Sequence, residues 1–234
     1  MDFLAFIPAR GGSKGIPNKN LVLLKGKPLI QYTVEAAKKS KYINEIFISS
    51  DDDKIINFCK SLGISVNYKR PSRLADDNTP MIDVVLDMIF WKKIHEKKLP
   101  DVIVLLQPTS PLRTSDDIDL AIEEFVRTNS ETLISVNLMR EHPYECIKLD
   151  GNKWSYLEKP STKVSRRQDY EKIFYFINGA IYIAKTSFLV SEKTFIEEGK
   201  SLLFFMESEK SVDIDDLYDL KFAESLISAN HSNL

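Results

Sequence analysis

The sequence predicts an α/β protein with a doubly wound, mainly parallel sheet. Strand-like and helix-like segments alternate from the N-terminus to Asn137, an order typical of repeated βα units. The segments 3–7 and 102–106 are continuous apolar runs, as expected for strands that are buried on both faces. The chain has 234 residues, 43% of them hydrophobic, so we expect a single domain over 1–234 with an inserted segment at about 139–177.

The individual elements follow from local patterns. Strands are expected at residues 3–7, 45–49, 65–68, 102–106, 132–137 and 179–184. Helices are expected at residues 29–39, 53–62, 81–96, 116–128 and 215–228. Gly63 closes the second of these helices, and Ser50 or Asp51 is its expected N-cap.

The inserted segment replaces this alternation with short pieces rich in tyrosine and charge. Asp150-Gly151-Asn152 is the expected turn between two short strands at 145–149 and 153–157. The basic cluster Arg166-Arg167-Gln168 lies further along this segment. Such a charge run is usually a solvated face, but a bidentate arginine would suit a substrate carboxylate if the cluster reached a binding crevice.

Composition excludes several classes of function. The net charge is -2, with 32 basic and 34 acidic residues, so no global field attracts the chain to nucleic acid or to an anionic membrane. Cys59 and Cys146 are expected as small buried side chains in a reducing compartment. No apolar run is long enough to span a bilayer, and no histidine pair has zinc-ligand spacing. We therefore expect a soluble, cytoplasmic protein without zinc.

The most informative segment is 7–20, a glycine-rich basic loop that follows the first expected strand. Its glycines let backbone N–H groups converge on phosphate oxygens, and its cations balance a polyanion such as a nucleoside triphosphate. These residues are Gly11, Gly12 and Gly15, with Arg10, Lys14 and Lys19. A solvated βα loop is the alternative, but open α/β sheets bind ligands at this end of the first strand. The spacing matches neither G-x-G-x-x-G nor G-x-x-x-x-G-K-[ST], which argues against a dinucleotide site and a P-loop.

Two further loops carry polar side chains at the ends of expected strands. Asp213 and Asp215 lie two residues apart in an expected strand that ends at the last helix, so both side chains would point to one face. Mg²⁺ commonly takes one or two carboxylates together with substrate phosphates, although Asp215 or Asp216 would also suit a helix cap. Gln107 and Arg113, after the most apolar strand, suit contact with a sugar or a carboxylate.

Several of these segments together resemble the acylneuraminate cytidylyltransferases, the CMP-sialic acid synthetases. The shared motifs are Ala-Arg-Gly-Gly-Ser-Lys-Gly with Lys-Asn at 9–20, Gln-Pro-Thr-Ser-Pro-Leu-Arg at 107–113, Asn-Gly-Ala at 178–180 and Asp-Ile-Asp at 213–215. They occur in this order from the first expected strand to the last expected helix. Each motif is moderately specific alone, and the ordered set is strongly so.

The resemblance implies a nucleotidyltransferase fold, Rossmann-like, with three αβα layers. It implies that CMP is transferred from CTP to the anomeric hydroxyl of a nine-carbon keto sugar acid, such as N-acetylneuraminate or legionaminic acid, with Mg²⁺ required and pyrophosphate released. It also implies a homodimer in which the inserted segment lies against the partner subunit. The inserted segment would then help to close the partner's active site.

The resemblance also assigns roles to residues of this chain. Arg10, Ser13, Lys14 and Lys19 would bind the triphosphate with the loop glycines Gly11 and Gly12, and Asn20 and Arg70 would hold the cytidine. Gln107, Arg167 and Gln168 would contact the sugar acid, and Asp213 and Asp215 would bind the metal ion.

The resemblance leaves alternatives open. Some relatives carry an arginine for the sugar just before Asn-Gly-Ala, where this chain has Phe176-Ile177, so the sugar acid could be pseudaminic acid or the eight-carbon acid of lipopolysaccharide. A non-catalytic nucleotide-sugar-binding module is the alternative of a different class, although such a module would not need paired aspartates. No histidine is placed to accept the proton of the attacking hydroxyl, which leaves an aspartate or a metal-bound water.

Overall fold

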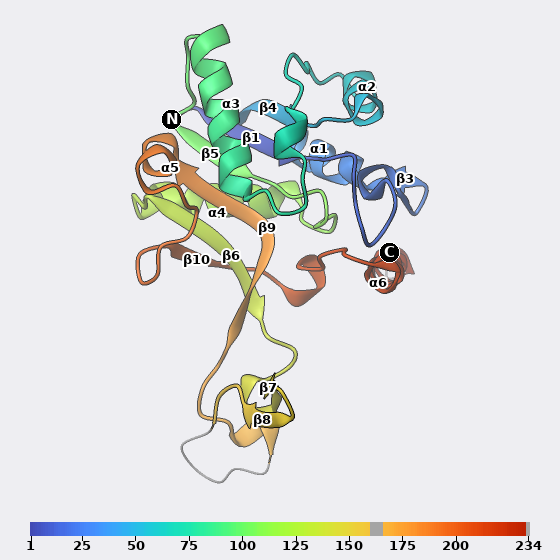
Figure 1. The fold of residues 1–234 in the computed structure, drawn as a ribbon, viewed down its shortest axis with the longest axis vertical. Helices are drawn as coiled ribbons and strands as arrows, with labels where there is room; N and C mark the ends of the chain where they lie inside the picture. Colours follow the sequence, from blue (N-terminus) through green and yellow to red (C-terminus); the bar gives the residue numbers. More distant parts are fainter. Residues whose placement is uncertain (160–165, 233–234) are drawn as a thin grey trace.

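The computed structural model describes residues 1–159 and 166–232, and its core is one mixed sheet covered by helices (Figure 1). Within the described residues the sheet has six strands. In spatial order they are β10 (Leu202–Phe205), β6 (Thr132–Leu138), β9 (Tyr175–Lys185), β5 (Val102–Leu105), β1 (Phe3–Pro8) and β4 (Ile43–Ser49). β1 is parallel to β4 and β5, and β10 is parallel to β6, whereas β9 is antiparallel to both of its neighbours. The predicted α/β class with a mainly parallel sheet is confirmed.

Helices cover both faces of the sheet because successive side chains of a strand point to opposite faces. In β1, Ala5 and Ile7 belong to the buried cluster that includes residues of α1 and α4, whereas Leu4 and Phe6 belong to the cluster that includes residues of α3 and α5. The helices are α1 (Leu29–Lys39), α2 (Asp53–Ser61), α3 (Met81–His95), α4 (Ser115–Arg127), α5 (Thr186–Glu192) and α6 (Leu217–Ser232). The result is a three-layer arrangement.

The N-cap of one helix and the start of another differ from the prediction. The N-cap of α2 is Asp52, whose side chain accepts the Lys54 N–H at 2.7 Å, so neither Ser50 nor Asp51 caps this helix. α6 begins at Leu217 rather than at residue 215, because the Asp216 carboxylate accepts the N–H groups of the first helical turn. The segment before α6 is a loop and not a strand.

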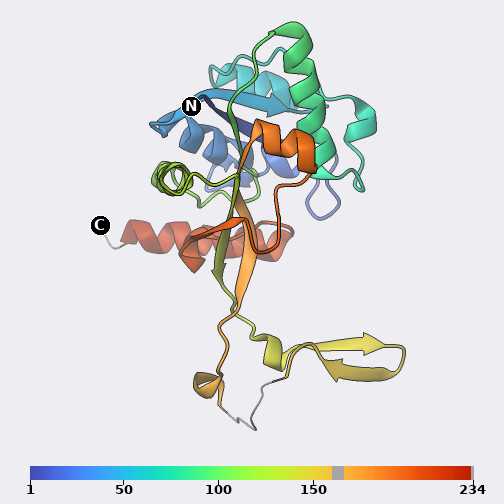
Figure 2. The ribbon, with the colours of Figure 1, turned by 90° about the vertical axis from the view of Figure 1, so that its left-hand side faces the viewer.

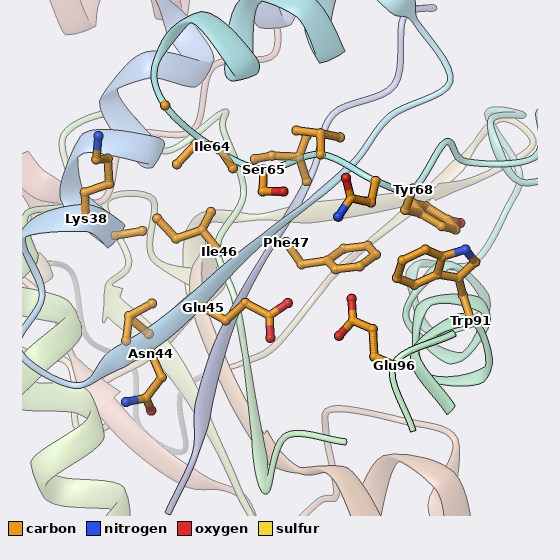
Figure 3. A pocket seen from close by; sticks show the side chains of 16 residues that line it. Lys38, Asn44, Glu45, Ile46, Phe47, Ile64, Ser65, Tyr68, Trp91 and Glu96 are labelled. Atoms are coloured by element: carbon orange, nitrogen blue, oxygen red, sulfur yellow. The ribbon is translucent and has the colours of Figure 1, made fainter. Parts of the chain in front are cut away.

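Residues 65–68 do not form the strand that was predicted for them. Its residues alternate between buried and exposed, with Val66 and Tyr68 buried, but they form no ladder with β4. Among the described residues, one backbone hydrogen bond joins residues 64–70 to this edge, from Arg70 N–H to the Ser50 carbonyl at 2.8 Å. A cavity of about 400 Å³ lies along the edge, and Tyr68 packs across it on Phe47 with ring centroids 5.2 Å apart (Figure 3). The alternation of apolar and polar residues correctly predicted which side chains of 65–68 are buried. Pairing of this segment with β4 depends in addition on the distance between the two segments.

Some elements carried too weak a pattern to be predicted. β10 and α5 were not expected, nor was the short antiparallel pair β2 (Leu23–Leu24) and β3 (Lys27–Pro28). Each of them is seven residues or shorter, so periodicity has little length in which to appear.

The inserted segment extends away from the sheet in both views (Figures 1 and 2). The chain leaves the core after β6 and returns with β9, and the Met139 N–H donates to the Phe174 carbonyl at 3.0 Å across the neck. β9 already begins at Tyr175, so the segment ends before residue 177. Its tip is the hairpin of β7 (Ile147–Asp150) and β8 (Lys153–Tyr156), where Gly151 supplies the left-handed turn conformation at φ 58°.

The two cysteines differ in burial. Cys59 is fully buried, and burial raises the pKa of its thiol to about 12, so it is the inert apolar side chain that was predicted. Cys146 lies in the inserted segment and is half-buried, so the prediction of a buried side chain is wrong there. The inserted segment has too few buried side chains to cover Cys146.

Candidate functional site

A crevice of about 650 Å³ opens at the carboxyl ends of β1 and β5. This is where open α/β sheets bind ligands. Most of the predicted site residues line it: Arg10, Ser13, Lys14, Lys19, Asn20, Arg70, Gln107, Asp213 and Asp215. Segments far apart in the sequence therefore meet in one place.

The glycine-rich loop is fastened to the second βα connection. The Gly11 N–H donates to the Asp51 carboxylate at 2.9 Å, and a side chain at Gly11 would come within 2.8 Å of the Asp52 Cβ. Gly12 has open space around it, so its lack of a side chain is not needed for packing. The acids at 51–52 thus support the loop as well as starting α2.

The glycine-rich loop also packs against the loop that carries the paired aspartates. A side chain at Gly15 would lie 2.2 Å from the Asp215 carbonyl oxygen, a distance that no substitution tolerates without backbone movement. Lys19 joins the same two loops, because its ammonium donates to the Ile214 carbonyl at 2.9 Å and to the Asp215 carboxylate at 3.0 Å. Cations and carboxylates are therefore held side by side.

The base of the loop is closed by buried polar contacts. Asn20 is buried, and its amide donates to the Arg10 carbonyl at 2.8 Å. Arg70 is also buried and donates to both the hydroxyl and the carbonyl of Ser49, at 2.9 and 2.7 Å. Burial lowers the pKa of the Arg70 guanidinium. Both side chains line the crevice while holding its backbone in place.

Asp77 was not predicted to belong to the site. Its carboxylate pairs with two cations of the glycine-rich loop, Arg10 at 2.5 Å and Lys14 at 2.7 Å. The hydrogen bond from Lys14, followed by that from Arg10, holds the pKa of Asp77 below its usual value. The acids Asp76 and Asp77, in the connection between α2 and α3, form no recognisable motif, so only the fold reveals that Asp77 faces the loop.

Asp213 and Asp215 differ in their surroundings. Asp213 is half-buried, and its inaccessible Oδ1 has no hydrogen-bond partner in the part of the chain that the structure describes. Burial raises the pKa of Asp213, and a hydrogen bond from the Thr109 side chain to the carboxylate opposes this rise. The nearby charge of Asp215 adds to the rise in pKa, and Lys19 opposes it. The Asp215 side chain is 78% exposed and accepts a hydrogen bond from Lys19. Because Asp216 caps α6, the Asp215 carboxylate does not serve as the helix cap.

This donor set suits a hard cation. A buried carboxylate oxygen without a partner is costly, and a divalent ion would satisfy it. The second carboxylate lies two residues away and opens to solvent, where water and phosphate oxygens could complete the coordination. The residues therefore fit Mg²⁺, although no group of three or more metal-binding side chains occurs among the described residues.

The polar loop after β5 divides into a crevice residue and a structural residue. Gln107 lines the crevice next to Thr109. Arg113 is buried, and it donates to the Ala180 carbonyl at 2.9 Å and to the Thr33 hydroxyl at 2.8 Å. Burial lowers the pKa of Arg113 to about 10. Arg113 supports the sheet end and does not reach the crevice, so its predicted ligand contact is wrong.

The predicted sugar contacts on the inserted segment are not near the crevice of the same chain. Arg167 and Gln168 are exposed on a short 3-10 helix of that segment, η4 (Arg167–Asp169). Neither side chain lines the crevice.

The fold and the crevice together define a nucleotidyltransferase-like α/β protein. A family model described as "Cytidylyltransferase" matches residues 4–228. The chain is 35% identical to CMP-N,N'-diacetyllegionaminic acid synthase of Legionella pneumophila, with 100% of both chains covered. It is 33% identical to the pseudaminic acid cytidylyltransferase of Campylobacter jejuni, with 100% of this chain and 99% of that protein covered. The chain therefore belongs to the cytidylyltransferase family and is a nucleotidyltransferase, which confirms the family resemblance.

A solved structure shares the fold. The structure of CMP:2-keto-3-deoxy-manno-octonic acid synthetase complexed with CTP superposes with a TM-score of 0.70. The two sequences are 15% identical, and the match covers 98% of this chain and 100% of that chain. In the described part of the present chain, no helix has the length and apolar character needed to cross a membrane.

Proposed function

We propose that this protein transfers CMP from CTP to the anomeric hydroxyl of a nine-carbon keto sugar acid of the nonulosonic class. The observation that carries the proposal is the contact between the cationic loop and the aspartate pair, which Gly15 and Lys19 hold together in one crevice. A triphosphate needs the cations, and transfer at its α-phosphate needs the carboxylates beside them. The two relatives matched from end to end carry names of this reaction class.

The glycine-rich loop would bind the triphosphate and offset the charge of the departing pyrophosphate. Arg10 and Lys14 would exchange their present partner, Asp77, for phosphate oxygens. Ser13 would add a hydroxyl donor, and the N–H groups near Gly12 are unobstructed by side chains. Asn20 and Arg70, both buried at the base of the crevice, would orient the cytidine.

Asp213 and Asp215 would hold Mg²⁺. When bound there, the ion would neutralise phosphate charge and orient the α-phosphate for in-line attack. Lys19 would hold the Asp215 carboxylate in the orientation it has now, through a 3.0 Å hydrogen bond. Gly15 would keep the two loops in contact, because a larger residue would push the aspartate loop away.

The attack itself needs little covalent chemistry from the protein. The anomeric oxygen bonds to the α-phosphorus as the bond to the β-phosphate oxygen breaks, and pyrophosphate leaves with that electron pair. The hydroxyl proton passes to a carboxylate of the crevice or to solvent. Gln107 would bind the sugar acid near the reacting oxygen, because it lines the crevice next to Thr109.

We further propose a cytoplasmic homodimer in which the inserted segment covers the partner's crevice. Apolar side chains on the segment lie open to solvent in the single chain: Ile147, Leu149, Trp154, Tyr156, Leu157 and Ile173. Such a patch on a protruding hairpin is typical of a protein interface. Docking would also bring Arg167 and Gln168 toward a second crevice, where an arginine would suit the sugar carboxylate.

Pyrophosphate release provides the direct test. We expect release with CTP and a nonulosonic acid in the presence of Mg²⁺, and little with ATP, GTP or UTP. The acceptor panel should contain N-acetylneuraminic, legionaminic and pseudaminic acids and the eight-carbon acid. No release with any combination would refute the enzyme and leave the binding module. Release with the eight-carbon acid alone would refute the nonulosonic class.

A further inference from the structure

A buried chain of polar side chains connects the sheet to the loop that carries Asp213. The Ile181 N–H donates to the Ser135 hydroxyl at 2.9 Å, and that hydroxyl donates to Asn178 Oδ1 at 2.5 Å. The Asn178 amide donates onward to the Ser211 hydroxyl at 3.1 Å, and Ser211 donates to the Glu207 carbonyl at 2.8 Å. Ser211 lies two residues before Asp213. This chain of hydrogen bonds from Ile181 to Ser211, called the relay below, therefore ends beside the proposed metal site.

The relay runs through an irregularity in the sheet. The pairing of β6 with β9 shifts register between Ile134 and Val136, and Asn178 lies in the part of β9 that this shift leaves out of the ladder. Gly179 adopts a φ of 73° there, which few other residues tolerate. The Ala180 N–H bonds Asn178 Oδ1 at 3.1 Å, so the side chain fixes the distorted backbone as well. Bulges of this kind commonly aim a side chain near an active site.

Asparagine is an unfavourable choice for a central strand. It is depleted in strands, and its burial requires a partner for each polar atom. Asn178 is 2% exposed; its Oδ1 accepts two hydrogen bonds and its amide donates one, which leaves the sheet for the aspartate loop. A buried asparagine in a strand goes against strand propensity, and its hydrogen bonds offset the cost of burial. Such an exception points to a functional requirement.

The aspartate loop is otherwise held at its other end. The Ile214 N–H donates to the Thr109 carbonyl at 2.8 Å, and Lys19 bonds Asp215. Neither contact fixes the chain on the N-terminal side of Asp213. On that side Val212 packs in the core and Lys210 contacts Asp117, and the Asn178–Ser211 bond links the loop to the sheet two residues before Asp213.

We infer that Asn178, acting through Ser211, is a positioning residue that aims the Asp213 carboxylate at the metal ion; this rests on the proposed metal-dependent function. Without the relay, the loop remains tethered at Val212, Ile214 and Asp215, but residue 211 loses its side-chain bond to the sheet, so the backbone that leads into Asp213 is held less firmly. Hydrogen-bond partners outside the ligand shell commonly change metal affinity by about 10- to 100-fold, and a partner acting through the backbone belongs at the lower end. The expected effect is about tenfold weaker metal binding.

The test uses Ser211→Ala and Asn178→Ala in the full chain, with Mn²⁺ as the probe. Ser211 is only half-buried, so its truncation keeps the test valid even if Asn178→Ala folds poorly. Thr132→Val is the matched control, because Thr132 is buried in the same strand as Ser135 and donates to the Phe195 carbonyl, on the other face of the core. Mn²⁺ binding is measured by electron paramagnetic resonance with CTP and without the sugar acid, so no turnover occurs.

We expect both variants to bind Mn²⁺ about tenfold more weakly than the wild type, with Thr132→Val unchanged. Raised metal concentration should restore pyrophosphate release, and the double variant should match the single variants because one relay is broken in each. Wild-type Mn²⁺ affinity in both single variants would overturn the inference. A wild-type chain that turns over without divalent metal would instead remove the metal site, and the inference with it.

Discussion

The crevice and the inserted segment are constructed in opposite ways. In the crevice, Arg10, Lys14 and Lys19 each have a carboxylate partner from a distant part of the same chain. In the inserted segment, the side chains of Leu149 and Trp154 are 74% and 59% exposed. Charge is balanced within one chain, whereas apolar surface is left uncovered. The proposed nucleotide-binding residues are therefore assembled within a single chain, whereas the inserted segment leaves apolar side chains exposed.

The largest effect should come from breaking the crevice at Asp215. Asp215→Asn removes a charge that the metal ion needs, and we expect turnover to fall by about 10³-fold. The fold should survive because the side chain is 78% exposed. Pyrophosphate release and circular dichroism measure the two outcomes. Asp216→Asn, at the helix cap, is the control, and a wild-type rate in Asp215→Asn would remove this residue from the metal site.

A smaller loss is expected at Lys19. Lys19→Ala deletes both the triphosphate contact and the tie to Asp215, and hydrogen bonds to charged groups contribute about 1.5–3 kcal/mol each. We expect kcat/KM for CTP to fall by about 100-fold, with a raised KM. Steady-state kinetics against CTP concentration tests this. Unchanged constants for CTP would refute the loop assignment.

The inserted segment is tested at Trp154. Trp154→Asp places a charge in the exposed apolar patch, and loss of an interface tryptophan commonly costs about 2 kcal/mol or more. We expect dimer dissociation to increase by about 30-fold, seen by sedimentation. Binding of CTP to the single chain should not change. Leu120→Asp on α4 is the control with similar exposure. A dimer as tight as the wild type would remove the patch from the interface.

The sequence predicted more of the crevice than of the inserted segment. The glycine-rich loop and the Asp213 pair were found because each residue type has a direct chemical reason and sits at an expected strand end. Asp77 was missed because its pairing depends on how the connection before α3 folds back over the loop. The exposure of Leu149 could not be predicted, since a strand pattern does not say whether the core of the same chain covers its apolar face.

The fold shows the same division. Long buried strands and amphipathic helices were predicted because their patterns extend over many residues. The relation of residues 65–68 to β4 was not, because the ladder depends on a spacing between segments that no local pattern encodes. The buried role of Arg113 was missed for a similar reason, since its acceptors at Thr33 and Ala180 come from other elements.

Burial of Asp213 predicts a gain in stability when its charge is removed. Because burial raises its folded pKa, the ionised carboxylate weakens folding as pH rises through the window between the unfolded and folded pKa values, and it has no effect below that window. In the absence of metal at neutral pH, we expect Asp213→Asn to stabilise the chain by about 1 kcal/mol. Thermal unfolding in a chelator measures this. Mg²⁺ with CTP should reverse the order, and equal stability of the two proteins at neutral pH in chelator would contradict the burial argument.

The smallest effect is expected at Asp77. Asp77→Asn frees Arg10 and Lys14 from a competing anion, so KM for CTP should fall by about two- to fivefold, a range set by the weakness of exposed ion pairs. Salt screens such pairs, so the difference should shrink at high ionic strength. Asp76→Asn is the neighbouring control. A raised KM in Asp77→Asn would show that Asp77 assists the nucleotide rather than competing with it.

The outer edge of β4 has a consequence for misfolding. A strand edge with unpaired backbone groups can template pairing with another chain, and proteins commonly guard such edges with charge. Here the buried ammonium of Lys92 holds the carboxylates of Glu45 and Glu96, whose oxygens face each other at the cavity in Figure 3. A foreign strand that displaced residues 64–68 would have to desolvate this cluster of one ammonium and two carboxylates. The cost of that desolvation would oppose pairing of a second chain with β4 at the edge of the sheet where the ladder stops.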